Sequence, residues 1–327
     1  MMVVKLTDVA KKAGVSATTV SRVINNYGYL SQKTIDKVQQ AIKELNYQPN
    51  SLARSLQGKN TQLVGLVFPT MRVPFFAELV ESLETKLFEK GYKVILCNSA
   101  NNKEKEREYL RMLGANKVDG IIAGSHNLGI DEYENFELPI VSFDRFLAVG
   151  IPIVSGDNFQ GGYLAAQTLL EDGCKKIAIF TGANNSNSPT NQRLNGYLHR
   201  MKEAALTPFT FRISSRYSAR LKGLDIQKAL QTEELDGIFC TDDFTAILTL
   251  QEAQKLGIKV PEQLKVIGYD GTQFVRESFP ALTTVAQPID DCATLLIELL
   301  CKRIKNKEQQ LDDLYTLPIQ LIKGTTA

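Results

Sequence analysis

The sequence predicts an α/β protein with two unlike parts, a small helical domain at the N-terminus and a larger body built on parallel β-sheets. The first observation is charge: residues 1–60 hold nine Lys or Arg against three Asp or Glu, whereas the rest of the 327-residue chain has a net charge of −4. The second is pattern: from residue 62 onward, short apolar runs alternate with amphipathic stretches, as in repeated βα units. A basic head therefore precedes a mildly acidic α/β body.

The basic part is predicted to form three short helices. Thr7 can cap a first helix, Ser16 a second over residues 17–25, and Ser31 a third, while Gly14 provides the positive φ of a sharp turn. Their apolar residues face one another: Val9, Ala10, Ala13, Val20, Val23, Ile24, Ile35, Val38, Ile42 and Leu45. An ordinary helical hairpin is the alternative, but three basic helices in this order favour a helix-turn-helix that binds DNA.

The body is predicted to contain parallel strands separated by helices. We expect strands at 63–68, 93–97, 120–123, 140–143, 177–180, 237–240 and 265–268, with helices around 75–90, 103–115, 160–171, 190–205, 243–256 and 290–305. Ligands of such sheets bind at the carboxyl ends of the strands. The chain has no glycine-rich dinucleotide or phosphate loop and only two histidines, so we expect no cofactor.

Polar residues follow several of these strands. Asp144 and Arg145 follow one strand, Asp242 follows another and Asp270 a third. Carboxylates and guanidinium groups hydrogen-bond several sugar hydroxyls at once, and aromatic rings such as those of Phe75, Phe76 and Tyr217 cover the apolar side of a sugar ring. The alternative is that the acids cap helices and the two phenylalanines are core residues.

The stretches LTDVAKKAGVSATTVSRVINN and YQPNSLARSL resemble the N-terminus of the LacI/GalR family of bacterial transcription regulators. The resemblance implies a DNA-binding domain at 1–49, a hinge helix or linker at 50–60, and an effector-binding and dimerisation domain at 61–327. It also implies a periplasmic-binding-protein-like body of two lobes, one comprising 62–160 and 291–318, the other 161–290 and 319–327. The expected partners are double-stranded operator DNA, a second copy of the chain and a small effector.

The same resemblance assigns residues to DNA. Ala17, Thr18 and Arg22 would face base edges, with Arg22 bidentate to a guanine. Thr7, Ser16, Thr19, Ser21 and Asn25 would lie near phosphates, although short polar residues also serve as helix caps. In the linker, Asn50, Ala53 and Leu56 would contact DNA. Leu56 matches a leucine that wedges into the minor groove, unless it packs on the body instead.

The resemblance also assigns the effector site. Asp144, Arg193, Asp242 and Asp270 match effector-contact positions, and Gln287 lies beside a crossing between lobes at Pro288. The full predicted set is Phe75, Phe76, Asp144, Arg145, Arg193, Tyr217, Asp242, Asp270 and Gln287. Stretches such as TVSRVINNYGYLSQKT and KVILCNSANNKEKEREYLRML are similar to the sucrose-operon repressors of Gram-positive bacteria, which implies sucrose, sucrose 6-phosphate or fructose as inducer. Control by a phosphoprotein or another corepressor stays open.

Other classes have less support. Asp242 and Asp243 could act in acid–base catalysis, but no nucleophile, metal set or phosphate loop accompanies them, so we expect no enzyme. A secreted sugar-binding protein needs a signal peptide, but residues 1–4, which Lys5 follows, do not form the apolar segment of one. No apolar run reaches the length of about 18 residues that a membrane-spanning helix needs. We therefore expect a cytoplasmic protein that does not bind membranes. The five cysteines are far apart, so we expect buried thiols rather than metal ligands.

Overall fold

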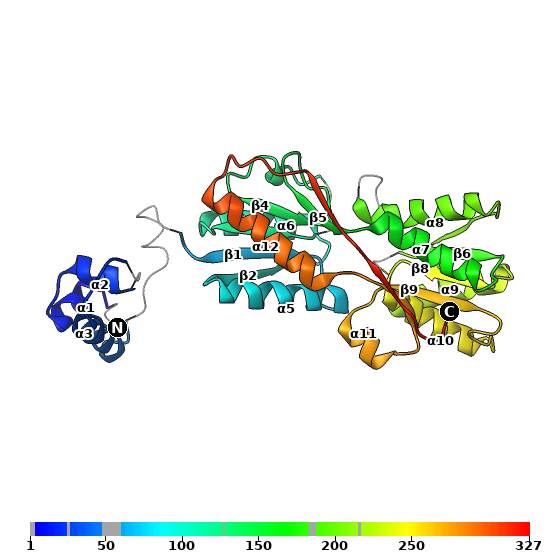
Figure 1. The fold of residues 1–327 in the computed structure, drawn as a ribbon, viewed down its shortest axis with the longest axis horizontal. Coiled ribbons are helices and arrows are strands. Elements are labelled where there is room, and N and C mark those ends of the chain that lie inside the picture. Colours follow the sequence, from blue (N-terminus) through cyan, green and yellow to red (C-terminus); the bar gives the residue numbers. More distant parts are fainter. Residues whose placement is uncertain are drawn as a thin grey trace. The chain divides into compact units, whose positions relative to one another are not determined.

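The computed structural model describes residues 4–24, 27–47, 60–125, 127, 129–182, 188–214 and 217–327 (Figure 1). The chain divides into two units, Met1–Thr61 and Gln62–Ala327, and each is described by itself. Across the described ranges, no helix is both long and apolar enough to cross a membrane.

The first unit contains the three predicted helices, α1 (Leu6–Ala13), α2 (Ala17–Ile24) and α3 (Gln32–Glu44). Val9, Val20 and Val38, one from each helix, are fully buried against one another. Gly14 has a φ of 68° and turns the chain after α1, and the Ser31 hydroxyl accepts a hydrogen bond from the Thr34 amide at 3.3 Å. The predicted three-helix core is therefore confirmed.

The predicted N-cap of the first helix is wrong. The helix begins two residues earlier than a cap at Thr7 implies, at Leu6, with Lys5 at the N-cap position. The Lys5 amide donates to the Asp8 carboxylate at 2.8 Å, so an acid in the first turn satisfies the N-terminal backbone in place of the Thr7 hydroxyl. Thr7 lies exposed within the first turn.

The second unit contains two six-stranded sheets, and each forms the centre of one lobe. The first sheet is entirely parallel and has the order β11-β5-β4-β3-β1-β2. Its strands are β1 (Leu63–Phe68), β2 (Lys93–Asn98), β3 (Gly120–Ala123), β4 (Ile140–Phe143), β5 (Ile153–Gly156) and β11 (Leu314–Leu317). The fold class predicted from the sequence, with parallel sheets in the body, is thus confirmed.

The second sheet has the order β12-β10-β9-β8-β6-β7, and only the β10–β12 pair is antiparallel. Its strands are β6 (Ile177–Thr181), β7 (Phe209–Arg212), β8 (Gly237–Cys240), β9 (Lys265–Asp270), β10 (Thr283–Ala286) and β12 (Gln320–Ile322). The sequence analysis gave no bounds for β5, β7, β10, β11 and β12.

Helices cover both faces of each sheet because alternate strand residues point to opposite sides. In the first lobe, α5 (Pro74–Glu89) and α12 (Ile289–Lys305) pack on one face and α6 (Lys103–Ala115) on the other. In the second lobe, α7 (Asn158–Glu171) and α8 (Gln192–Glu203) cover one face, α9 (Ala219–Thr232) and α10 (Asp243–Lys255) the other. The short α11 (Gln273–Ser278) lies between β9 and β10. Four cysteines are buried in these layers, and Cys301 is half-buried.

The chain crosses between the lobes three times, from β5 to α7, from β10 to α12, and from β11 to β12 (Figure 1). The last crossing is the red segment that runs from one sheet to the other. Strands β4, β8 and β9 end beside these crossings and place the residues that follow them at the boundary between the lobes.

Candidate functional site

The first candidate surface is the outer side of α2. Ala17, Thr18 and Arg22 are exposed there, opposite the buried Val20 and Val23. The side chains that face away from the three-helix core are thus short, except for one guanidinium. Because its neighbours are short, Arg22 can reach base edges in the groove of a duplex.

Two of the other predicted DNA residues, Ser16 and Thr19, lie at the start of α2. The Ser16 hydroxyl accepts from the Thr19 amide at 3.1 Å, so Ser16 caps the helix, and it lies 2.9 Å from the Thr19 hydroxyl. Ser21 is half-buried. Asn25, Asn50, Ala53 and Leu56 lie outside the described residues.

The second candidate site is a cavity of about 170 Å³ at the boundary of the two lobes. It is lined by Val73, Phe75, Phe76, Gly124, Phe143, Asp144, Arg145, Gly182, Thr190, Arg193, Lys222, Thr241, Asp242, Phe244, Asp270 and Gln287. Eight of the nine residues predicted for the effector therefore come together. Tyr217 does not line the cavity: it lies in the turn before α9, where its amide donates to the Ser214 carbonyl, and its side chain is 47% exposed.

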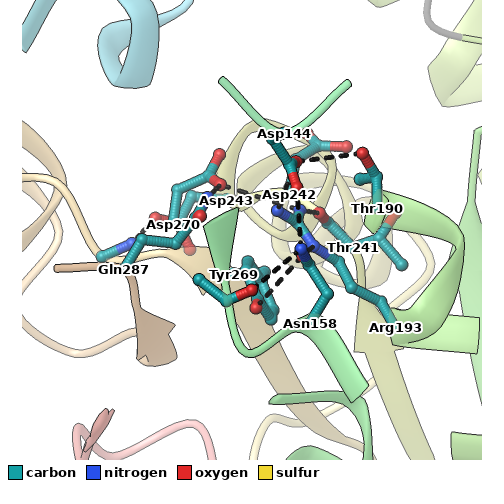
Figure 2. A network of polar contacts seen from close by, with 12 residues as sticks. Asp144, Asn158, Thr190, Arg193, Thr241, Asp242, Asp243, Tyr269, Asp270 and Gln287 are labelled. Carbon is teal, nitrogen blue, oxygen red and sulfur yellow. Dashed lines mark hydrogen bonds and ion pairs between the residues drawn. The ribbon is translucent and has the colours of Figure 1, made fainter. Parts of the chain in front are cut away.

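Arg193, in the first turn of α8, lines this cavity and takes part in a network of polar contacts (Figure 2). Its Nε donates to Asn158 at 2.6 Å and its Nη1 to the Thr241 carbonyl at 2.7 Å. The guanidinium lies 3.7 Å from the centre of the Tyr269 ring, a cation–π contact. These contacts fix the side chain in one orientation.

Arg193 also connects the two lobes electrostatically. Its Nη2 lies 4.0 Å from the carboxylate of Asp144, which follows β4 in the first lobe. Its Nη1 lies 3.8 Å from the carboxylate of Asp270, the last residue of β9 in the second lobe. A ligand bound here would touch charged groups from both lobes.

Close packing of α7 and α8 sets the position of Arg193. A Cβ atom at Gly162 would lie only 1.9 Å from the Arg193 carbonyl oxygen, and one at Gly196 would lie 2.0 Å from the Phe159 carbonyl oxygen. Any side chain at either glycine would push α8 away from α7. The two glycines therefore hold the arginine at its distance from the carboxylates.

Asp144 has a φ of 53°, and three side chains donate to its carboxylate. Ser155 donates at 3.0 Å, Asn158 at 2.8 Å and Thr190 at 3.0 Å. The neighbouring Arg145 donates to the Asp144 carbonyl at 2.8 Å and also contacts the hydroxyls of Ser188 and Thr190. Burial lowers the pKa of Arg145 to about 10, although Asp144 opposes this shift.

Asp242 and Asp270 line the opposite side of the cavity, and the buried Asp243 follows Asp242 in the chain. Asp242 caps α10 by accepting from the amide and hydroxyl of Thr245, so the capping interpretation applies to it as well. Asp243 accepts from the Gly271 amide at 2.8 Å and the Thr284 hydroxyl at 2.6 Å. Burial raises the pKa of Asp243 to about 7 and that of Asp270 well above its ordinary value.

Phenylalanine rings form the apolar side of the cavity. Phe75 is buried, and its ring centre lies 5.5 Å from those of Phe76 and Phe143. Both phenylalanines that were predicted to contact ligand therefore also belong to the core of the first lobe. Aromatic surface on one side and convergent donors and acceptors on the other suit a polyhydroxylated ring.

The sequence analysis missed several residues of the cavity: Val73, Gly124, Phe143, Gly182, Thr190, Lys222, Thr241 and Phe244. Thr241 and Phe244 flank the predicted Asp242, so the end of β8 was a usable signal. The sequence contained no signal for Lys222, because α9 was not predicted and a lysine on a helix is usually exposed.

A helix-turn-helix unit and a two-lobed domain with a polar cavity define a ligand-responsive DNA-binding regulator. Two family models match the chain, bacterial regulatory proteins of the lacI family over residues 5–50 and the periplasmic binding protein-like domain over residues 166–327. With the full-length similarities below, they show that the chain belongs to the LacI family of bacterial regulatory proteins.

The particular relatives are repressors. The chain is 56% identical to the sucrose operon repressor of Pediococcus pentosaceus and 54% identical to that of Streptococcus mutans, each over 99% of both sequences. Among solved structures, the Lac repressor dimer bound to operator and the anti-inducer ONPF matches with a TM-score of 0.85 and 25% identity, over 99% of both chains.

Proposed function

We propose that the protein represses a sugar-utilisation operon, a sucrose operon in the first instance, and leaves its operator when a small sugar or sugar phosphate binds the cavity. The observation that carries the proposal is Arg193, which joins carboxylates from both lobes in a cavity suited to hydroxyls. The chain's similarity to sucrose operon repressors supports the choice of operon.

The DNA-bound form is proposed to be a homodimer on a palindromic operator. The eight residues of α2 are too few for long base-edge readout, and two copies related by a two-fold axis double the contacts. Arg22 is proposed to read one guanine in each half-site. Asn50, Ala53 and Leu56 are proposed to contact DNA between the half-sites, with Leu56 inserting into the minor groove.

Release of DNA is proposed to follow from differential affinity. A sugar that bridges Asp144 and Asp270 through Arg193 favours one arrangement of the lobes, and operator DNA favours another. Linkage then requires the sugar to weaken operator binding by the same factor by which operator weakens sugar binding. We expect the protein to be a regulator without enzymatic activity.

The test is a titration of the operator complex. A palindromic operator is selected from random DNA with the full-length protein, and fluorescence anisotropy follows the complex as sucrose, fructose or sucrose 6-phosphate is added. We expect at least one of them to release the DNA. A sugar that instead tightens operator binding would make the ligand a corepressor, and no response to any sugar would refute the proposed inducer class.

A further inference from the structure

We propose that the ligand of the cavity is a phosphorylated sugar whose phosphate is bound by Lys222. The inference rests on the proposed function, since it specifies the class of ligand that the repressor senses. It comes from a charged group that the contacts described above leave without an opposite charge.

Lys222 lies on α9, and its side chain lines the cavity although the residue is only 6% exposed. Its Nζ lies 3.5 Å from the Thr245 hydroxyl and 5.3 Å from the centre of the Phe244 ring. A buried ammonium group is strongly unfavourable unless a negative charge accompanies it. A hydroxyl and a ring face are weak substitutes for a carboxylate.

The two arginines of the cavity have such partners. Arg145 lies 3.9 Å from the Asp144 carboxylate, and Arg193 lies within 4.0 Å of both Asp144 and Asp270. Lys222 forms no ion pair with any carboxylate in the described part of the chain. Lys222 is therefore the cation of this cavity that is left to meet a charge brought by the ligand.

Asp242 does not fill this role. Its two carboxylate oxygens accept from the Thr245 amide at 2.8 Å and the Thr245 hydroxyl at 2.9 Å, so they cap α10. The Thr245 hydroxyl separates this carboxylate from Lys222. The first turn of α10, which carries Thr245, also adds the positive end of a helix dipole to the surroundings of the Lys222 ammonium group.

The charges of the cavity lining leave room for an anion. Among the described residues, the lining holds three cations, Arg145, Arg193 and Lys222, and three acids, Asp144, Asp242 and Asp270, so no excess of negative charge repels one. Burial raises the pKa of Asp270, which weakens its negative charge at a given pH. A phosphate monoester carries between one and two negative charges near neutral pH and accepts hydrogen bonds on three oxygens.

The sugar part of the ligand has a matching acceptor. The Gln287 Oε1 atom is buried and accepts no hydrogen bond from the described residues, while its Nε2 donates to Asp270 at 2.8 Å. A sugar hydroxyl would satisfy this oxygen. One ligand that carries both hydroxyls and a phosphate would thus meet both unused groups, Gln287 Oε1 and Lys222 Nζ.

The test compares charged and neutral ligands on the full-length protein by isothermal titration calorimetry. The ligands are sucrose 6-phosphate, sucrose and glucuronate, and inorganic phosphate is added as a competitor. The variants are Lys222→Met, Lys222→Arg and, as a matched control, Lys228→Met, which removes an exposed lysine from the same helix. Thermal melting and binding to the selected operator report whether each variant is folded.

We expect the natural protein to bind sucrose 6-phosphate roughly 10- to 100-fold more tightly than sucrose, the range of one charge-assisted hydrogen bond. Lys222→Met should remove most of that preference, Lys222→Arg should keep much of it, and Lys228→Met should keep all of it. Inorganic phosphate should compete with sucrose 6-phosphate only where residue 222 is cationic.

Several results would overturn the assignment of a phosphate to Lys222. Equal affinity for sucrose and its phosphate, or an unchanged preference in folded Lys222→Met, overturns the inference. Preference for glucuronate over sucrose 6-phosphate would mean that Lys222 binds a carboxylate, and it would overturn the proposal of a phosphate ligand. If sucrose alone binds and releases the operator, the proposed function holds and this inference fails; if no ligand binds while the operator does, both the inference and the proposed inducer class fail.

Discussion

Arg22 and Arg193 are both proposed to bind a ligand, yet their surroundings are opposite. Arg22 is exposed on α2, whereas Arg193 is 4% exposed, stacks on Tyr269 and contacts carboxylates of both lobes. An exposed side chain adds binding without supporting the fold, but a buried charged network does both. Substitutions in the helical unit should therefore separate binding from stability, and those in the cavity should not.

The largest effect is expected from Arg193→Met. It leaves the Asp144 and Asp270 carboxylates buried without their guanidinium partner, and such a loss lowers the free energy of unfolding by about 3–5 kcal/mol. The three other donors to Asp144 place the expected value toward the lower end of that range. Urea denaturation of the natural protein and the variant measures the difference.

Arg200→Met is the control for this substitution. Arg200 lies on the same helix, is 18% exposed, has Glu203 within 3.8 Å and donates to Gln167, so its loss removes one partly exposed ion pair and one hydrogen bond. We expect a clearly smaller change. Equal destabilisation by the two variants would show that the cavity network does not support the fold.

The second prediction concerns pH. The pKa of Asp243 is about 7 in the folded protein against an ordinary 3.8, because burial disfavours its charged form. Between these values the folded state binds more protons than the unfolded state, so the free energy of unfolding falls as pH rises from about 4 to about 7. A tenfold difference in proton affinity between the folded and unfolded states corresponds to about 1.4 kcal/mol.

Asp243→Asn removes the ionisable group and should flatten this slope. Urea denaturation at pH 5 and pH 7.5 measures it, with the exposed Asp172→Asn as the control for loss of a negative charge. A slope that is the same in Asp243→Asn and the natural protein would assign the pH dependence to other groups.

The smallest effect on the fold is expected from Arg22→Ala. It should weaken operator binding by about 1–3 kcal/mol and relax preference at one base pair, while the free energy of unfolding stays unchanged. Affinities for the operator and for random DNA are measured at two salt concentrations. An equal loss on both DNAs would mean that Arg22 contacts phosphate rather than a base.

Apolar runs separated by amphipathic stretches made the fold predictable from the sequence. Continuous apolar runs gave β1, β3, β4 and β8 with their observed bounds, because strands buried on both faces carry no alternation. β7, β11 and β12, for which no bounds were predicted, are half-exposed strands at sheet edges, where the apolar signal is weak. The cap of α1 was missed because Asp8, inside the helix, replaced Thr7 as the acceptor.

The candidate cavity was predictable in part. Asp144, Asp242 and Asp270 follow or end strands, and topology brings those ends together. Arg193 and Gln287 came from family resemblance, since nothing local distinguishes them. Lys222 required the structure, because only the packing of α9 against α10 buries a lysine on an otherwise ordinary helix. Tyr217 was assigned as a ring face, but its turn leaves it exposed.

The central claim is that the cavity and the DNA-binding unit are energetically coupled. The most direct measurement is a closed cycle on the full-length protein: operator affinity with and without sucrose 6-phosphate, and affinity for that sugar with and without operator. We expect both affinities to fall by the same factor, about 5- to 150-fold, and Arg193→Met to bring the factor close to one. Operator affinity that is unchanged by saturating ligand would contradict the account.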